Sequence, residues 1–159
     1  MNADTYVAPF VRAAADVLPS MLDLAVTGGQ PQPEGDSFRS RGFTVIVGFT
    51  GGWSGRFFLD MSQDTALQLA GLLTGEQYHS VAEEEVLLSC AEIGNIISGH
   101  AITEVNDRLP GCGIRLTPPS VFAGTEVSMF NVKLSSWSVV MSTAAGDLRL
   151  NVAVEEARS

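Results

Sequence analysis

Cysteine and positive charge are both scarce in this sequence of 159 residues. The two cysteines, Cys90 and Cys112, are too few for a disulfide framework and lack the paired spacing of a zinc site. Nine basic residues stand against eighteen acidic ones, which gives a net charge of -9. Because nucleic-acid phosphates are neutralised by basic surfaces, this balance argues against a nucleic-acid partner.

Long apolar runs are also missing. Residues 1–6 lack the basic start and apolar run of a secretory signal. No later segment approaches the roughly 20 uninterrupted apolar residues of a membrane span, so we expect a cytoplasmic protein without a membrane partner. The composition is 45% hydrophobic and 17% charged, which is enough apolar surface for a core, and we expect one domain over residues 1–159.

The spacing of apolar residues predicts three helices. The first covers residues 8–24, where Pro19 should kink or break it. The second is bounded by Ser62, a residue typical of an N-cap, and Gly75, a residue typical of a C-cap. The third covers residues 81–109 and begins with an acidic run, which favours the positive end of a helix dipole.

Alternating apolar residues and turn residues predict antiparallel hairpins between and after these helices. Residues 27–37, rich in Gly, Pro and Gln, are expected to form a loop. The predicted strands cover residues 43–49, 53–61, 121–124, 137–141 and 148–154. The final hairpin should leave sheet edges open to pairing. Together these elements indicate an α+β fold, a mostly antiparallel sheet with long helices packed on it.

The helix over residues 81–109 has two different faces. At about 100° per residue, one arc must face the core and holds Val86, Cys90, Ile93, Gly94, Ile97 and Ala101. The opposite side holds Leu88, Glu92, Asn95, Gly99 and Ile102. Only Glu92 and Asn95 are strongly polar there, which suggests a contact surface rather than a solvated one. These two residues emerge side by side, and Gly99 removes bulk about one turn further on.

Simpler explanations exist for each of these residues. An exposed Glu is usually only solvated, and an Asn within a helix often makes a cap or core hydrogen bond. Gly99 could equally serve helix packing. His100 lies near the edge of the core arc, where a hydrogen-bonded structural histidine is the expected role. Neither His100 nor His79 has the neighbours of a metal site, so we expect no bound metal.

A resemblance to a known family adds to this pattern. The segment Glu92-Ile93-Gly94-Asn95-Ile96-Ile97-Ser98-Gly99-His100-Ala101 resembles the active helix of the CheC/CheX/FliY family of chemotaxis phosphatases. That family has Glu-x-x-Asn followed after 22 residues by Pro, and 22 residues separate Asn95 from Pro118 here. The similarity extends from about residue 44 to the C-terminus. One position departs from the pattern: Leu88 stands where the family often has Ser or Asp. A single Glu-x-x-Asn copy is typical of the CheX-like branch, which forms homodimers.

The resemblance implies a CheC-like fold and a protein phosphatase of two-component signalling. Its substrate would be the aspartyl phosphate of a CheY-like response regulator. Asn95 would position the attacking water and Glu92 would pair with the regulator's active-site Lys. Leu88, Gly99 and Pro118 would contact the regulator, and the Mg²⁺ would belong to the regulator, so no cofactor is expected in this chain.

Two other functions stay open. One is a catalytically silent binding module that docks a regulator or a signalling assembly. The other, less favoured, is a hydrolase with a Ser or Cys nucleophile, for which no Gly-x-Ser-x-Gly or Cys/His signature occurs.

Overall fold

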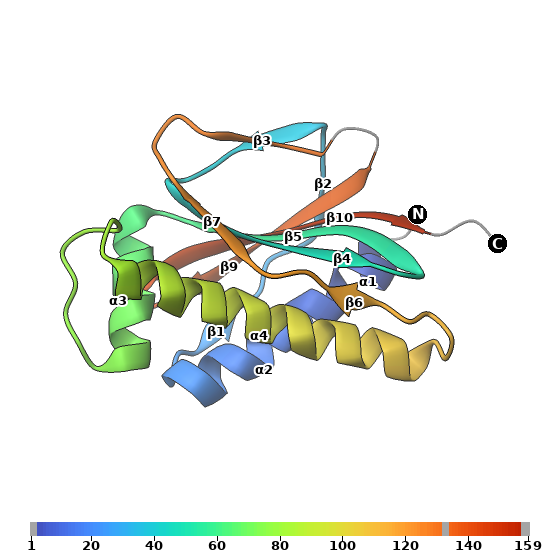
Figure 1. Cartoon of the computed structure of the whole chain (residues 1–159), viewed down its shortest axis with the longest axis horizontal. Helices are drawn as coiled ribbons and strands as arrows, with labels where there is room; N and C mark the ends of the chain where they lie inside the picture. The colour runs from blue at the N-terminus through green and yellow to red at the C-terminus, as the bar shows by residue number, and fades with distance from the viewer. Residues whose placement is uncertain (1–2, 132–133, 157–159) are drawn as a thin grey trace.

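The structure, a computed structural model, describes residues 3–131 and 134–156, and it is built in three layers (Figure 1). An antiparallel sheet of eight strands lies in the middle. Helices α2 (Ala8–Leu22) and α4 (Glu84–Arg108) run across one face, and α3 (Gln63–Thr74) closes one end. A short ribbon of two strands lies on the other face. The predicted α+β fold is therefore confirmed.

The order of strands in the main sheet is β1-β9-β10-β5-β4-β6, with β2 also paired to β9 and β7 also paired to β4. The central part is formed by the two predicted hairpins. The bounds are β1 (Val26–Thr27), β2 (Gln32–Glu34), β4 (Phe43–Thr50), β5 (Trp53–Met61), β6 (Arg115–Leu116), β7 (Ser120–Ala123), β9 (Ser135–Thr143) and β10 (Gly146–Glu156). The separate ribbon pairs β3 (Ser37–Arg39) with β8 (Ser128–Phe130).

Two expectations about the sheet were wrong. The segment 27–37 is not only a loop, because β2 within it pairs with residues 136–138 of β9. The final hairpin does not offer free edges: β10 lies between β9 and β5, and the outer side of β9 is covered by β1 and β2. These short strands form because they pair with a distant segment of the chain. They have no apolar alternation, so the sequence pattern does not predict them.

The helix ends follow capping chemistry. Ser62 accepts a hydrogen bond from the backbone N–H of Thr65 at 3.1 Å, and Gly75 ends α3 with a φ of 79°, so both predicted caps are confirmed. Helix α2 continues through Pro19, which is exposed, and ends at Leu22 with Asp23 in a left-handed conformation. Pro19 therefore neither breaks the helix nor marks its end.

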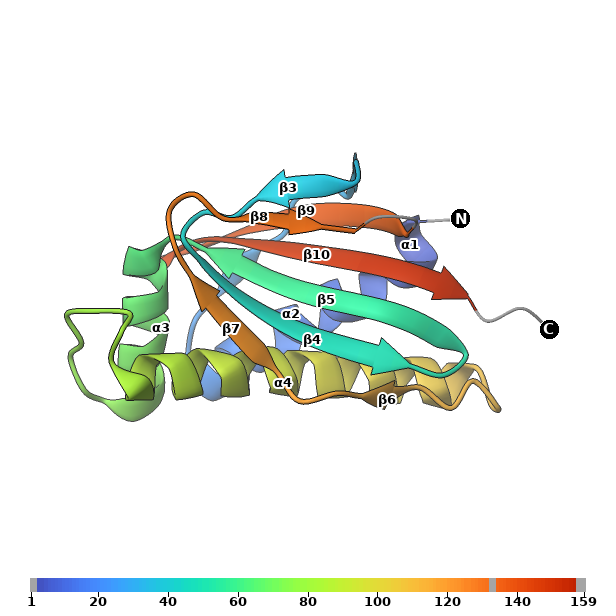
Figure 2. The same ribbon diagram turned by 45° about the horizontal axis from the view of Figure 1, so that its top comes forward.

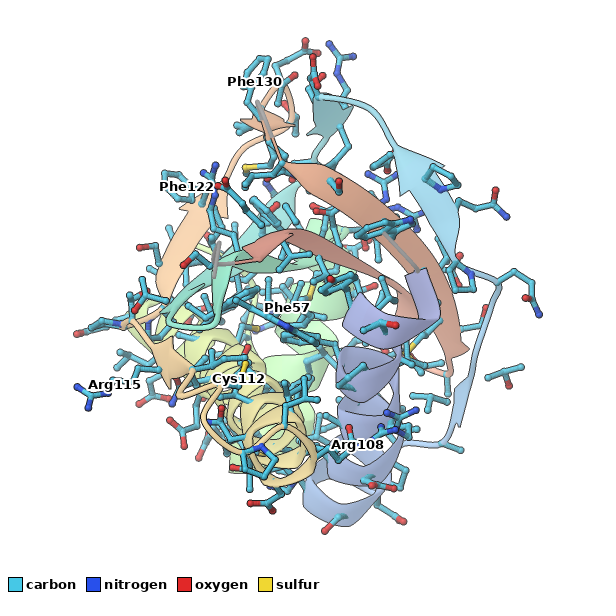
Figure 3. All side chains as sticks on the ribbon, turned by 90° about the vertical axis from the view of Figure 1, so that its right-hand side faces the viewer. Phe57, Arg108, Cys112, Arg115, Phe122 and Phe130 are labelled. Atoms are coloured by element: carbon cyan, nitrogen blue, oxygen red, sulfur yellow. The ribbon has the colours of Figure 1, made fainter. Side chains whose placement is uncertain are left out.

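The main core lies between the sheet and the helices. Phe10 of α2 stacks against Phe57 with a ring distance of 5.0 Å and also meets Phe49 at 5.9 Å. In Figure 3, Phe57 lies inside this layer, whereas Phe122 and Phe130 lie at the outside. These contacts hold α2 against the sheet, and α4 packs beside α2 with Val86, Cys90, Ile93, Ile97 and Ala101 all fully buried.

The ribbon covers a second, smaller core on the opposite face of the sheet. Phe38 of β3 packs edge-on against Phe58 of β5 at a ring distance of 5.3 Å. Beside them Asp60 is fully buried and accepts hydrogen bonds from the hydroxyls of Ser40 at 2.8 Å and Thr44 at 2.7 Å. A buried carboxylate needs such partners, and they tie the ribbon's entry to the sheet.

A short helix, α1 (Ala3–Tyr6), precedes α2 at the end of the molecule where β10 finishes (Figures 1 and 2). Its Tyr6 ring lies 4.7 Å from that of Trp53 and 5.7 Å from that of Trp137. This aromatic group closes the core at the end opposite α3.

Candidate active site on helix α4

The rotation of α4 is fixed by its close contact with β4. A Cβ built on Gly94 would lie 2.7 Å from Cγ1 of Val45, so no larger residue fits between the helix and the sheet without movement. Residues on the opposite side of the helix must therefore point away from the sheet. Glu92 is exposed there, and Asn95 is partly exposed toward one flank.

The Glu92 and Asn95 side chains are not used by the fold. Neither makes a side-chain hydrogen bond or an ion pair within residues 3–131 and 134–156. A mid-helix Asn that served as a core or cap residue would have such a partner. The carboxylate and the amide, three residues apart, are thus both available to a molecule outside the chain.

The surface around the pair is open. A Cβ added to Gly99 would meet nothing within 4 Å, and Leu88 is 61% exposed one turn before Glu92. An exposed leucine and a bare glycine on either side of the pair leave room for another backbone to approach. Gly99 has no packing role toward the described residues, which removes the simpler explanation considered for it.

Pro118 lies exposed in the connection between β6 and β7, two strands that contact both β4 and α4 (Figure 2). The preceding residue anchors this connection, because the Thr117 N–H donates to the Gly48 carbonyl at 2.8 Å. The threonine hydroxyl also occupies the space where a Cβ on residue 48 would stand, 2.6 Å away, which explains the glycine there. Pro118 is therefore fixed along the flank of the helix that carries the pair.

Asn106, in the last turns of α4, was not among the residues predicted for this region. Its side chain donates to the Ile114 carbonyl at 3.0 Å and accepts from the Ile114 N–H at 2.9 Å. The two bonds hold the crossover that runs from the helix end into β6. A helical Asn shortly before Pro110 and Gly111 was the available sequence signal, since such an amide can bond a returning backbone.

Two predicted orientations on α4 were wrong. Ile102 is only 5% exposed and belongs to the same core cluster as Ile114, because the crossover covers this flank of the helix. His100 is exposed, and its ring makes no hydrogen bond to the residues that the structure describes. The core-facing arc of α4 stops short of it, so the structural role expected for this histidine does not hold.

The start of α4 is set by Glu83, three turns before the pair. Its carboxylate accepts hydrogen bonds from the backbone N–H groups of His79 at 2.9 Å and Ser80 at 3.0 Å. These bonds favour the charged form and lower the pKa of Glu83. They tie the preceding loop to the helix, so α4 begins at Glu84 rather than at residue 81.

The cysteines do not form a nucleophilic site. Cys90 is fully buried, and burial raises the pKa of its thiol to about 12, so it stays protonated at neutral pH. Cys112 lies half-buried on the crossover after α4. Within the described ranges, no three His, Cys, Asp or Glu side chains are grouped so that they could hold a metal ion.

By length and composition alone, α4 could cross a membrane, but half of its most apolar stretch is buried inside the domain. The buried half packs against α2, α3 and β4. This helix is therefore the core helix of the fold, and its apolar character is explained by packing.

Comparison with known proteins places this geometry in a family. Solved structures with the same fold include the chemotaxis protein CheX of Desulfovibrio desulfuricans, at 22% identity and a TM-score of 0.83, covering 93% of this chain and 97% of that one. The CheX in a complex with CheY, BeF3 and Mg²⁺ from Borrelia burgdorferi is 30% identical with a TM-score of 0.78, covering 95% and 98%. FliY of Thermotoga maritima is more distant, at 19% identity and a TM-score of 0.59, covering 93% and 84%. No curated protein matches the chain.

The fold and its open helix thus define a chemotaxis protein of the CheC-like class. The family model described as "Chemotaxis phosphatase CheX" matches residues 43–142, from β4 nearly to the end of β9. The chain belongs to the CheX family.

Proposed function

We propose that this protein is a cytoplasmic phosphatase that hydrolyses the aspartyl phosphate of a CheY-like response regulator. The observation that carries the proposal is the pair Glu92 and Asn95, which projects from an exposed helix face without partners in the described fold. The Borrelia relative, whose structure is a complex with CheY, supports a regulator as the partner.

The proposed reaction needs little chemistry from this chain. Water attacks phosphorus, the bond between phosphorus and the aspartyl oxygen breaks, and the products are the regulator's carboxylate and inorganic phosphate. An acyl phosphate is already activated, and a hundredfold acceleration requires only about 2.7 kcal/mol. Holding a water in line with phosphorus can supply this amount, and no covalent intermediate on this chain is involved.

Each residue of the pair has its own role in this proposal. The Asn95 amide can both donate and accept hydrogen bonds, so it can orient a water, much as a Gln does in GTPases. Glu92 would form an ion pair with the regulator's active-site Lys and fix the docked geometry. Mg²⁺ would come with the regulator. Leu88, Gly99 and Pro118 would line the contact, and the protein would act as a homodimer.

The test is phosphate release from phosphorylated candidate regulators, with binding measured in parallel. Asn95→Ala should leave docking largely intact and slow turnover by about ten- to a hundredfold or more, or 1.4 to 2.7 kcal/mol. Glu92→Ala should weaken binding as well. The double substitution should cost less than the sum of the single ones, because both side chains serve one geometry.

Asp107→Asn provides a matched control, since Asp107 is an exposed acid on the same helix about 22 Å from Glu92 along the axis. It should change neither rate nor affinity. The alternative is a silent binding module, which Leu88 at the usual Ser or Asp position favours. A wild-type protein that binds its cognate regulator but never accelerates phosphate release would establish that alternative.

A further inference from the structure

A pocket of about 680 Å³ lies at the end of α4, beside the start of α2. The residues that line it include Pro9, Arg12, Trp53, Val105, Arg108 and Leu109. Figure 3 looks at this end of the molecule, with Arg108 on the side of α2 and Arg115 on the opposite side of α4. Arg108 lies about 24 Å along the helix from Glu92, so this pocket is separate from the candidate active site.

The deep part of the pocket is apolar. Trp53 and Val105 are each only 3% exposed and form its floor, while Leu109 at the rim is 45% exposed. A bound apolar group would cover the Leu109 side chain and the accessible edge of the floor, and removing this apolar surface from water would favour its binding. The floor is fixed because the Trp53 ring is held by Tyr6 at a ring distance of 4.7 Å.

The rim of the pocket is positively charged. Among the described residues that line it, the charged ones are Arg12 and Arg108, and both guanidinium groups reach the same carboxylate oxygen of Glu104. Arg12 donates a hydrogen bond of 2.8 Å from its Nε to Oε1 of Glu104, whereas the nearest guanidinium nitrogen of Arg108 lies 3.6 Å from that oxygen. One carboxylate faces two guanidinium groups, so among these three side chains one positive charge is left uncompensated.

We propose that this pocket binds a small anion with an apolar body, such as an aromatic carboxylate. The carboxylate would pair with Arg108, which is 65% exposed and not committed to a short bond, and the rings would lie over Trp53 and Val105. A volume of 680 Å³ is within the range of small-molecule sites, about 300–1,000 Å³. A protein partner would need a contact of roughly 800 Å² per side, far more than one rim leucine offers.

The ligand probe is 1-naphthylacetate, with the neutral 1-naphthylacetamide as its matched control. Calorimetric titration of the full chain should show saturable binding of the acid and binding at least about tenfold weaker for the amide, because the amide cannot form the ion pair. Arg108→Gln should remove that difference between acid and amide. Arg115→Gln, an exposed arginine on the other side of α4, should leave it unchanged.

Three results would overturn the proposal. They are an absence of binding at millimolar acid, equal affinity for the acid and the amide, and an equal loss of binding in Arg108→Gln and Arg115→Gln. A fourth result would also overturn it: if light scattering shows the protein associating and acid binding is lost as it does so, the pocket is an interface with a second copy of the chain. Circular dichroism of each variant shows that the fold is kept, as expected for exposed arginines.

Discussion

Gly94 and Gly99 of α4 lie five positions apart and have opposite surroundings. Gly94 touches Val45 in the core, whereas nothing lies near Gly99. Sequence periodicity assigned both glycines to the correct faces, together with Glu92 and Asn95. The same periodicity placed Ile102 on the exposed face. Ile102 is instead buried, because the crossover after α4 covers that flank, and helical periodicity contains no information on the position of a distant segment.

The two glycines provide a matched test of the proposed contact surface. We expect Gly99→Leu to fold normally, with a slightly higher melting temperature because helix propensity improves by up to about 1 kcal/mol, and to dock poorly on the regulator. Gly94→Ala should lower stability by about 1–3 kcal/mol, because Val45 is buried and its branched side chain cannot rotate away freely. Thermal unfolding and regulator binding separate the two effects. Unfolding of Gly99→Leu would make this glycine a packing residue.

Ser98, next to Gly99, carries a buried hydroxyl without a hydrogen-bond partner in the described structure. Ser98→Ala removes this unpaired group and improves helix propensity, so we expect stability to rise by about 1 kcal/mol in urea unfolding. Ser138→Ala is the contrasting control, because its hydroxyl bonds Glu34 and Asn151, each at 2.9 Å. That variant should lose about 1–2 kcal/mol. A destabilised Ser98→Ala would show that the hydroxyl has a partner, such as a bound water.

At the scale of elements, local sequence features predicted the helix caps and the two long hairpins, but they did not predict the pairing of the short strands. Ser62 and Gly75 each act within a few residues, so the sequence contains the causes of both caps. Strand β2 has three residues, two of them exposed, and pairs only because β9 offers an edge. No periodic pattern can reveal such a strand, and the hydrogen bonds of Asn106 likewise depend on where the chain returns.

Asn106 connects the end of α4 to the segment that leads to Pro118, and it offers a test at this scale. Asn106→Ala leaves the backbone N–H and carbonyl of Ile114 without partners, so we expect a loss of about 1–3 kcal/mol in unfolding free energy. If the crossover positions Pro118 for docking, affinity for the regulator should fall too, while Asn106→Asp should recover part of both. Unchanged affinity in a destabilised variant would limit Asn106 to a structural role.

At the scale of the whole molecule, the order of the strands could not be predicted. Strand β10 pairs with β5, so that Arg149 lies opposite Asp60, although the intervening chain contains two helices and four strands. Apolar alternation predicted each hairpin but carries no information on which hairpins become neighbours. The resemblance supplied the fold that periodicity alone could not.

The homodimer stays a prediction, but open sheet edges no longer support it, because β1 and β2 cover the outer side of the final hairpin. The remaining reason is the likeness to the CheX-like branch. Light scattering at micromolar concentration should give twice the chain mass of 16.8 kDa. Glu92→Ala should have the same mass if the pair lies outside the interface. A monomer throughout this range would contradict the expectation.

The central place of β10 also bears on how the protein is made. Of the ten strands described, the ribosome completes this one last, yet it joins β9 to β5 in the middle of the sheet. Before it emerges, α4 has no completed sheet to pack on, and its apolar face stays open to chaperones. Pairing between distant segments also slows folding relative to helical domains. Nascent chains that stop before Gly146 should therefore be digested readily by protease, and resistance should appear only after β10 has left the exit tunnel.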